Sequence, residues 1–265
     1  MPSPSRATDR ITGRFTLRRM STNIDRMRTE AQLWVTWRAL TGEALPEDAA
    51  ALVSSFPEVA HAADPRLPLK TRVIDTDREE RPVALFTTIE RPYETWHLIG
   101  LLNWRDNSAL YALQLARCGL TPGDEWIVAD FWGRASLGIA SHAVGRRLGG
   151  RSCLLLSLRA NLRRPQIVGT TRHLSMGGVE MNDIGWNDAT ETLHGQVGPD
   201  AVDIMLRVPH PYRPIAVEGS ELTSIAEARA SLSFPAAPGW RTFDVRFNQV
   251  APDVSGRQPL RFLVD

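Results

Sequence analysis

The first regular pattern of hydrophobic residues lies near the N-terminus and has helical spacing. Apolar side chains recur at intervals of three and four residues on one predicted helical face, at Ile24, Met27, Ala31, Trp34 and Val35. Leu33, Trp37 and Leu40 widen this face, so we expect the helix to be buried over more than half of its surface. Ser21 is suited to cap the start of the helix, and Gly42 is suited to end it.

A second, shorter helix is predicted directly after the first. Pro46 suits the first turn of a helix, and Pro57 is expected to stop it. One face of this stretch collects the apolar residues Leu45, Ala49, Leu52, Val53 and Phe56. The two helices together assign residues 21–65 to a helical segment.

From residue 66 onward the hydrophobic period changes to about two, which is typical of β-strands. Six short apolar runs follow one another, at residues 83–89, 96–104, 108–116, 124–132, 136–144 and 152–160. Turn residues such as Asn107, Pro122, Gly123 and Gly133 separate these runs. This spacing of roughly ten residues between turns predicts an antiparallel β-sandwich over residues 66–165.

The rest of the chain repeats this pattern with weaker apolar content. The candidate strands are QIVGTTRHL, VEMNDIGW, TETLHGQV, AVDIMLRVP, PIAVEGSEL, ASLSF, WRTFDVRFN and PLRFLVD. Residues 221–230 could hold a short helix instead of a strand. Residues 166–265 therefore form either a second β-lobe or the continuation of one large sandwich. The predicted fold class is mainly β, an antiparallel β-sandwich preceded by two N-terminal α-helices.

Charge and composition argue against nucleic acid and membranes as binding partners of this chain. The chain has 265 residues and a formal net charge of +1, so nucleic acid is not expected to bind it. Residues 1–20 are basic and rich in Pro, Ser and Thr, and we expect them to be poorly ordered and not a signal peptide. No segment approaches the roughly 18 consecutive apolar residues of a membrane span. A cytoplasmic location without a membrane partner is the expectation.

Two segments of the β region resemble a known family. The first is LIGLLNWRDNSALYALQLARCGLTPGDEWIVADFWGRASLG, residues 98–138. It is similar to the β-sandwich that follows the barrel in α-galactosidase-like (melibiase) glycoside hydrolases, where an IGLFNWSD strand and turn precedes L-x-x-LGL and then a DFW strand. The matching residues are Ile99, Gly100, Leu101, Leu102, Asn103, Trp104, Asp106, Leu115, Gly119, Leu120, Val128, Asp130, Phe131, Trp132, Leu137 and Gly138.

The second segment is RHLSMGGVEMNDIGWNDATETLHGQV, residues 172–197, which resembles the family's RHITQGGV and TLSG segment. The resemblance is carried by Arg172, His173, Leu174, Gly177, Gly178, Val179, Asp183, Trp186, Thr192, Leu193 and Gly195. The predicted helix RMRTEAQLWVTWRAL is similar to the last barrel helices of the same enzymes. The resemblance implies a C-terminal β-sandwich region joined to a remnant of those helices.

The departures from the family decide what activity to expect. Its (β/α)₈ barrel needs about 250 residues, and only about 40 residues of helix precede the β region here. The family's two catalytic carboxylates lie at the ends of barrel strands, and no residue of this chain corresponds to them. We therefore expect a region that lacks the catalytic barrel, and we assign no catalytic residue.

A search for a replacement pair of carboxylates finds none. A retaining glycosidase holds two carboxylates about 5–5.5 Å apart in a cleft. Four acidic residues fall in turns, namely Glu79, Glu80, Asp124 and Glu125. Asp106 and Asp130 end apolar strands, where we expect them, like Asn103, to bond the turn backbone. Trp104 is expected to cover the sheet edge.

Tryptophan is the most informative residue type for ligand binding, because an aromatic face suits the C–H-rich face of a pyranose. Trp186 and Trp240 lie beside polar turns and are our candidates for sugar binding. Trp96, Trp126 and Trp132 alternate with apolar strand residues and are expected in the core. No two of the six histidines have the spacing of a local metal motif, so we assign neither a metal nor a cofactor.

Three functions follow from these expectations. The chain could be the non-catalytic C-terminal portion of an α-galactosidase-like glycoside hydrolase. It could instead be a stand-alone carbohydrate-binding or accessory module, or a subunit that completes a separately encoded hydrolase barrel. A barrel partner or a second copy of the chain would dock on the helix face around Trp34.

Overall fold

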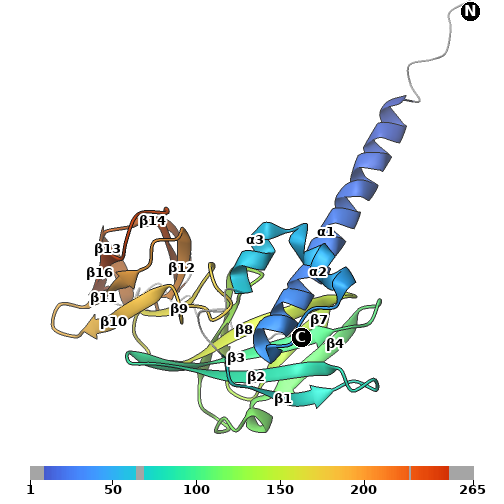
Figure 1. Ribbon diagram of the computed structural model, residues 1–265. Coiled ribbons are helices and arrows are strands. Elements are labelled where there is room, and N and C mark those ends of the chain that lie inside the picture. The colour runs from blue at the N-terminus through green and yellow to red at the C-terminus, as the bar shows by residue number, and fades with distance from the viewer. Residues whose placement is uncertain (1–8, 64–68, 227, 251–265) are drawn as a thin grey trace, which may run out of the picture.

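The computed structural model describes residues 9–63, 69–226 and 228–250. Within these ranges the chain forms a helical layer and two β units (Figure 1). The predicted fold class, mainly antiparallel β with N-terminal helices, is confirmed. No helix in these ranges is both long and apolar enough to span a bilayer.

The first helix begins earlier than the sequence pattern predicted. Helix α1 spans Asp9–Thr41, so the N-cap predicted at Ser21 is wrong. Residues 9–20, which we expected to be poorly ordered, are helical, while residues 1–8 lie outside the described part. Arg, Leu and Met favour helix in this stretch, and no proline interrupts it. The predicted end is confirmed, because Gly42 has a φ of 75° and donates its N–H to the Arg38 carbonyl at 2.8 Å.

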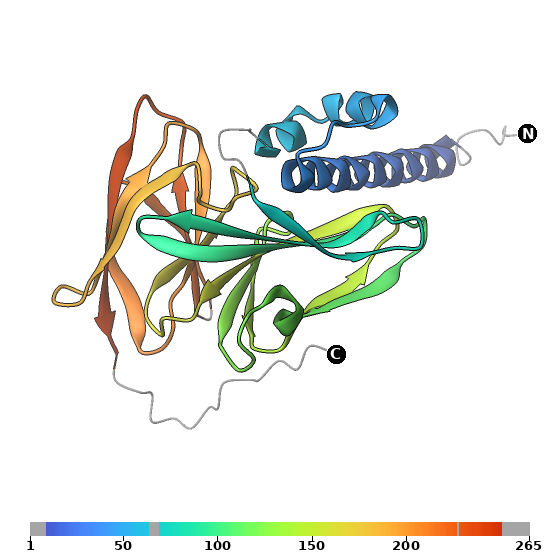
Figure 2. The same cartoon turned by 60° about the horizontal axis from the view of Figure 1, so that its bottom comes forward.

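Two short helices complete the layer. They are α2 (Glu47–Ser54) and α3 (Pro57–Ala60), and α3 continues into the 3₁₀ turn η1 (His61–Ala63). Pro46 is the N-cap of α2, one residue before the predicted first turn. Pro57 begins α3 rather than merely stopping α2, because a proline at the first helical position leaves no hydrogen bond unmade. All these helices lie on one face of the first sheet (Figure 2).

The first β unit is a six-stranded antiparallel sheet with the order β1-β2-β3-β8-β5-β6. Its strands are β1 (Thr71–Thr76), β2 (Pro82–Arg91), β3 (Glu94–Asn103), β5 (Trp126–Asp130), β6 (Ala135–Ala140) and β8 (Ser152–Ala160). The 3₁₀ turn η2 (Leu115–Cys118) and a two-stranded ribbon lie on the face opposite the helices, and the ribbon consists of β4 (Ala109–Gln114) and β7 (Ala143–Leu148). The central strands β3 and β8 are therefore buried along almost their whole length.

Each face of this sheet has its own hydrophobic core. Side chains alternate along β3, so Leu98 packs toward the helices and Ile99 toward the ribbon. Gly100 faces α1, and a Cβ at this position would lie only 2.6 Å from Cδ1 of Leu40. A larger residue here would require the Leu40 side chain to move, so glycine allows Leu40 to pack directly on the sheet.

The second β unit is a sandwich of two four-stranded antiparallel sheets, β10-β11-β16-β13 and β14-β15-β12-β9. The strands are β9 (Gln166–Thr170), β10 (Met181–Asn187), β11 (Thr192–Val197), β12 (Val202–Arg207), β13 (Tyr212–Glu218), β14 (Glu221–Ala226), β15 (Arg229–Phe234) and β16 (Arg241–Gln249). The core between the sheets includes Ile204, Leu206, Leu232, Phe234, Phe243 and Val245.

Several predicted strands need correction. The run 136–144 is two strands, β6 and β7, because the chain turns at Ser141 and His142 without a glycine or proline. The run PIAVEGSEL likewise divides into β13 and β14 at Gly219. The helix considered for 221–230 is wrong, since β14 pairs with β15 there. Strand β1 was not predicted, and PLRFLVD lies outside the described residues.

A half-buried histidine makes the first sheet sensitive to pH. The ring of His97 lies between Phe86 and Trp126, with centroid distances of 5.1 and 5.2 Å, and Nδ1 is 3.0 Å from Oγ1 of Thr88. Burial lowers the pKa of His97 below its ordinary value of 6.5. The unfolded chain then takes up this proton at a higher pH than the folded chain. The contribution of the neutral His97 ring to the free energy of unfolding is therefore complete above pH 6.5. It is lost as the pH falls through the pKa that His97 has in the folded chain.

We predict that His97→Gln removes part of the acid sensitivity of folding. Urea unfolding should show the wild-type free energy of unfolding falling as the pH drops below 6.5, with a smaller fall in the variant. His142→Gln, at an exposed histidine, is the control and should behave like the wild type. The same loss of stability in all three proteins would contradict the assignment to His97.

Candidate functional site

The polar residues at the end of β3 form a turn. Asn103 is completely buried, and its amide donates to the carbonyls of Asn107, at 3.0 Å, and Gly149. Its Oδ1 accepts the N–H of Arg105 at 3.1 Å and the hydroxyl of Tyr111 at 3.0 Å. The predicted role of Asn103 in bonding the turn backbone is confirmed, because every polar atom of its side chain is used within the protein.

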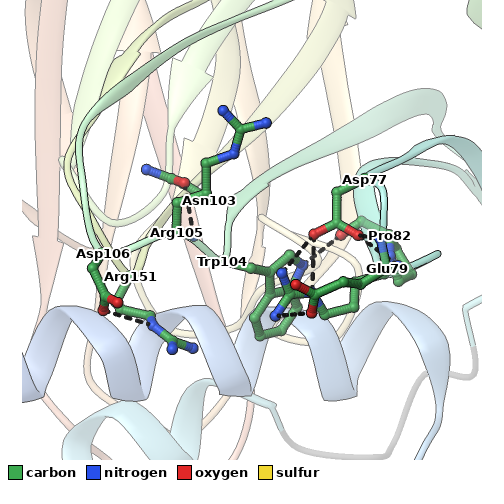
Figure 3. A network of polar contacts seen from close by, with 9 residues as sticks. Asp77, Glu79, Pro82, Asn103, Trp104, Arg105, Asp106 and Arg151 are labelled. Carbon is green, nitrogen blue, oxygen red and sulfur yellow. Dashed lines mark hydrogen bonds and ion pairs between the residues drawn. The ribbon is translucent and has the colours of Figure 1, made fainter.

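The neighbours of Asn103 point away from one another (Figure 3). Trp104 is buried and donates its indole N–H to the Pro82 carbonyl at 2.7 Å. Asp106 is exposed and forms an ion pair with Arg151, with 3.3 Å between Nε and Oδ1. Among the described residues, its carboxylate pairs with Arg26 and Arg151 and with no backbone group, so the prediction that Asp106 bonds the turn backbone is not met. These side chains enclose no common cavity.

We predict a large difference between two substitutions at this strand end. Asn103→Ala should lower the free energy of unfolding by about 1–3 kcal/mol, because it leaves buried carbonyls and an N–H without partners. Asp106→Ala should change it by no more than about 0.5 kcal/mol, because Asp106 pairs only at the surface. Chemical denaturation of both variants measures the difference. Equal losses would show that the buried amide is not the anchor of the turn.

Asp130 ends β5 and is also held within the protein. Its side chain is 1% exposed, and Oδ2 lies 3.1 Å from a guanidinium nitrogen of Arg146 on β7. Burial raises the pKa of Asp130, while the nearby amides of Gly133 and Trp132 and the charge of Arg146 act in the opposite direction. A Cβ at Gly133 would lie 2.5 Å from Oδ2, so glycine makes room for the carboxylate. Within the described residues the carboxylate pairs with Arg146, and neither of its oxygens makes a hydrogen bond to a turn amide, so the bonding predicted for Asp130 is not found.

The second segment that resembles the hydrolase family surrounds a buried arginine. Arg159, at the end of β8, is 2% exposed and lies over the ring of Trp96, with 4.0 Å between Cζ and the ring centroid. It forms an ion pair with Glu94 and donates to the Met176 carbonyl at 2.8 Å. The guanidinium therefore links the first sheet to residues 171–180, which join β9 to β10.

Further hydrogen bonds fix residues 171–180 on three sides. The indole N–H of Trp96 donates to the Ser175 carbonyl at 3.0 Å, and the Leu174 N–H donates to the Ala62 carbonyl at 2.9 Å. The hydroxyl of Tyr93 bonds the carbonyls of this segment and of β10 at 3.2 Å. The segment thus connects the helical layer, the first β unit and the second, and this is a structural role.

We predict that Arg159→Met lowers the free energy of unfolding by about 3–5 kcal/mol, because it removes one partner of a largely buried ion pair. The double variant with Glu94→Gln should lose less than the sum of the two single variants, since the uncompensated charge is then absent. Denaturant unfolding of the four proteins gives the coupling. Strict additivity would show that the pair is not coupled.

The two tryptophans proposed for sugar binding lie apart. Trp186 is half-buried, and its ring packs at 5.8 Å from Tyr212 and 5.9 Å from Phe247. Trp240 precedes β16 and is 51% exposed. The strand ladder places Trp186 level with Val245, which is roughly 17 Å along the strand from Trp240. The fold therefore does not bring them into one site.

An open groove of about 540 Å³ crosses the outer face of the sheet β10-β11-β16-β13. Its lining is polar and includes Asn187, Thr192, His194, Glu218, Asp244 and Arg246. His194 is paired with Asp244 across the sheet, and Asp244 is paired with Glu218. Its lining contains no Phe, Tyr or Trp side chain, so the groove offers hydrogen bonds without a large aromatic face.

A second cleft separates the helical layer from the second β unit. Two cavities of about 440 and 640 Å³ share Glu58, Arg134 and Thr171 in their linings, so they adjoin, and we treat them together as one cleft. Helix α1 contributes Gln32, and the turn after β5 contributes Trp132. The two segments that resemble the hydrolase family meet here, because DFW forms one wall and residues at the start of RHLSMGGV form another. We call this space the inter-unit cleft.

Three of the four carboxylates that line the inter-unit cleft are engaged by neighbours. Glu58 forms an ion pair with Arg28 at 3.3 Å, and Asp200 forms one with Arg172 at 3.2 Å. Asp203 accepts a hydrogen bond of 2.8 Å from a serine hydroxyl of β15. The cleft is thus rich in paired charges. Such groups can hydrogen-bond a ligand while each charge keeps its partner of opposite sign.

Sequence reasoning did not find the inter-unit cleft. Gln32, Glu58 and Arg134 come from segments far apart in the chain, and no local pattern links them. Trp132 was noticed only as a core residue. Across the described ranges, no group of three or more His, Cys, Asp or Glu side chains is arranged to bind a metal ion.

Comparison with known proteins gives partial structural similarity only. No protein-family model and no curated protein matches the sequence. A GH27 β-L-arabinopyranosidase from Geobacillus stearothermophilus covers 43% of the chain at 16% identity, with a TM-score of 0.30. α-Galactosidase I from Mortierella vinacea covers 49% at 15% identity with a TM-score of 0.35, and an isomalto-dextranase from Arthrobacter globiformis T6 covers 83% at 11% identity with a TM-score of 0.33.

The chain spans only part of each of these proteins, namely 24%, 35% and 46% of their lengths. By name, the first of the three is a GH27 β-L-arabinopyranosidase and the second is an α-galactosidase. Similarity of this size does not establish a common fold and does not transfer an activity.

Proposed function

We propose that the chain is the non-catalytic C-terminal portion of an α-galactosidase-like glycoside hydrolase. The observation that carries this proposal is that the segments resembling the family serve the scaffold. Asn103 holds a turn, Asp130 is closed off beneath Arg146, and Arg159 fixes the segment between the two β units. Residues used in this way support the packing of a β region and do not act on a substrate.

The arrangement of carboxylates also supports a non-catalytic role. A retaining glycosidase needs two carboxyl groups about 5–5.5 Å apart, one of them in a desolvated position. Asp130 is buried without a second carboxylate among its recorded contacts. Glu218 and Asp244 are neighbours across β13 and β16, but both are exposed on the face of a sheet. Neither arrangement encloses a glycosidic bond.

A stand-alone accessory module is the second candidate, and the inter-unit cleft is the observation that favours it. A subunit that docks through the face around Trp34 has less support. Trp34 packs at 4.9 Å from Trp104 and 5.6 Å from Trp37 of the same chain, so much of this face is already used.

We predict that the purified chain does not hydrolyse a chromogenic α-galactoside above the rate of a protein-free blank. The reason is that neither Asp130 nor the exposed neighbours Glu218 and Asp244 provide a desolvated pair of carboxylates. The measurement is release of the chromophore at several protein concentrations. Glu218→Gln and Asp244→Asn are the matched controls. Turnover that persists through purification and disappears in either variant would refute the non-catalytic assignment.

A further inference from the structure

We propose that the inter-unit cleft is a binding site for a neutral saccharide, with a sugar ring packed against Trp132 and hydrogen-bonded by Gln32 and Arg134. The choice of a saccharide rests on the proposed function, whereas the location rests on the cleft itself. The site differs from the predicted sugar platforms Trp186 and Trp240, which lie on the second β unit.

Trp132 is held in a fixed position at the wall of the cleft. Its indole N–H donates to Oγ1 of the buried Thr36 at 2.9 Å, and its ring meets Phe131 edge-on at 4.8 Å. The side chain is half-buried and lines the cavity. A ring already immobilised by its neighbours loses little freedom when a ligand packs on it, which favours binding.

Two polar side chains beside Trp132 have no partner within the described ranges. Gln32 is half-buried, and its amide makes no hydrogen bond there. Arg134 forms no ion pair there, although Arg28 and Arg172 in the same cleft do. Arg134 also has a φ of 47°, a left-handed conformation that costs a non-glycine residue free energy. Unused donors and acceptors next to a fixed aromatic ring are the two elements of a sugar site.

The charge of the cleft selects against a strongly ionic ligand. Three arginines and four carboxylates line it, and they are interspersed: Arg28, Arg134, Arg172, Glu58, Asp200, Asp203 and Glu221. A polyanion or a polycation would meet repulsion at several of these groups. A polyhydroxyl ligand both donates and accepts hydrogen bonds, so it can use carboxylates and guanidinium groups together.

The dimensions of the cleft also suit a saccharide. The cavity beside Trp132 has a volume of about 440 Å³, within the range of about 300–1,000 Å³ for small-molecule sites. It continues into the second cavity of about 640 Å³, so an oligosaccharide can extend along the cleft. The open groove on the second β unit has a similar volume but no Phe, Tyr or Trp in its lining, and it is the weaker site.

Isothermal titration of the full chain with galacto-oligosaccharides tests the proposal, with gluco-oligosaccharides of the same length as the specificity arm. We expect saturable binding in the millimolar range or tighter. Trp132→Ala should weaken it at least tenfold. Arg134→Gly should weaken it by about tenfold, the loss of one charge-assisted hydrogen bond, and glycine suits the backbone at this position. Trp240→Ala and Arg246→Ala are matched controls that should bind like the wild type.

Each outcome decides the matter. Binding that falls in Trp132→Ala or Arg134→Gly and persists in both controls supports the cleft. If Trp132→Ala does not fold, Arg134→Gly and Gln32→Ala give the answer. No binding up to about 10 mM sugar, or binding lost only in a control variant, overturns the proposal. Absence of binding together with absence of α-galactoside turnover leaves the proposed function standing, whereas turnover removes that function independently of the titration.

Discussion

Burial of both faces of the central strands β3 and β8 is the constraint on which the rest of the structure depends. Strands of this kind cannot present a polar side to water, so each face must be covered by other parts of the chain. Helices α1 to η1 cover one face, and the ribbon of β4 and β7 covers the other. Gly100 allows the helix to come close enough, because a side chain there would meet Leu40. The helices are thus a required part of the core.

The same constraint explains the polar residues at the strand ends. A buried sheet edge leaves donors and acceptors that water cannot reach, and each needs a partner inside the protein. Asn103 donates to carbonyls beside the end of β3, Asp130 forms an ion pair with Arg146 at the end of β5, and Arg159 donates to Glu94 near the end of β8. Polar groups at the end of an apolar strand can therefore satisfy the hydrogen bonds at the end of a sheet. They need not belong to a catalytic site.

The sequence was informative where the local pattern and the tertiary constraint agree. The runs 83–89 and 152–160 became β2 and β8, because continuous apolar residues require a strand buried on both faces. The hydrophobic pattern did not predict elements whose formation depends on contacts with distant parts of the chain. The turn at Ser141 and His142 contains no glycine or proline, and Thr71–Thr76 alternates too weakly to be recognised as an edge strand. The inter-unit cleft was beyond reach, because its walls come from helices, a turn and a second β unit that meet only in the folded chain.

The cleft and the scaffold are physically coupled. Residues 171–180 are fixed by Arg159 on one side and by the Ala62 carbonyl on another, and the chain enters this segment through Thr171, which lines the cleft. Trp132, on the opposite wall, is tied to α1 through Thr36. Both walls are therefore set by buried hydrogen bonds before any ligand arrives, so a ligand would bind without first ordering them. The hydrogen bonds that hold the scaffold together therefore also fix the shape of the cleft.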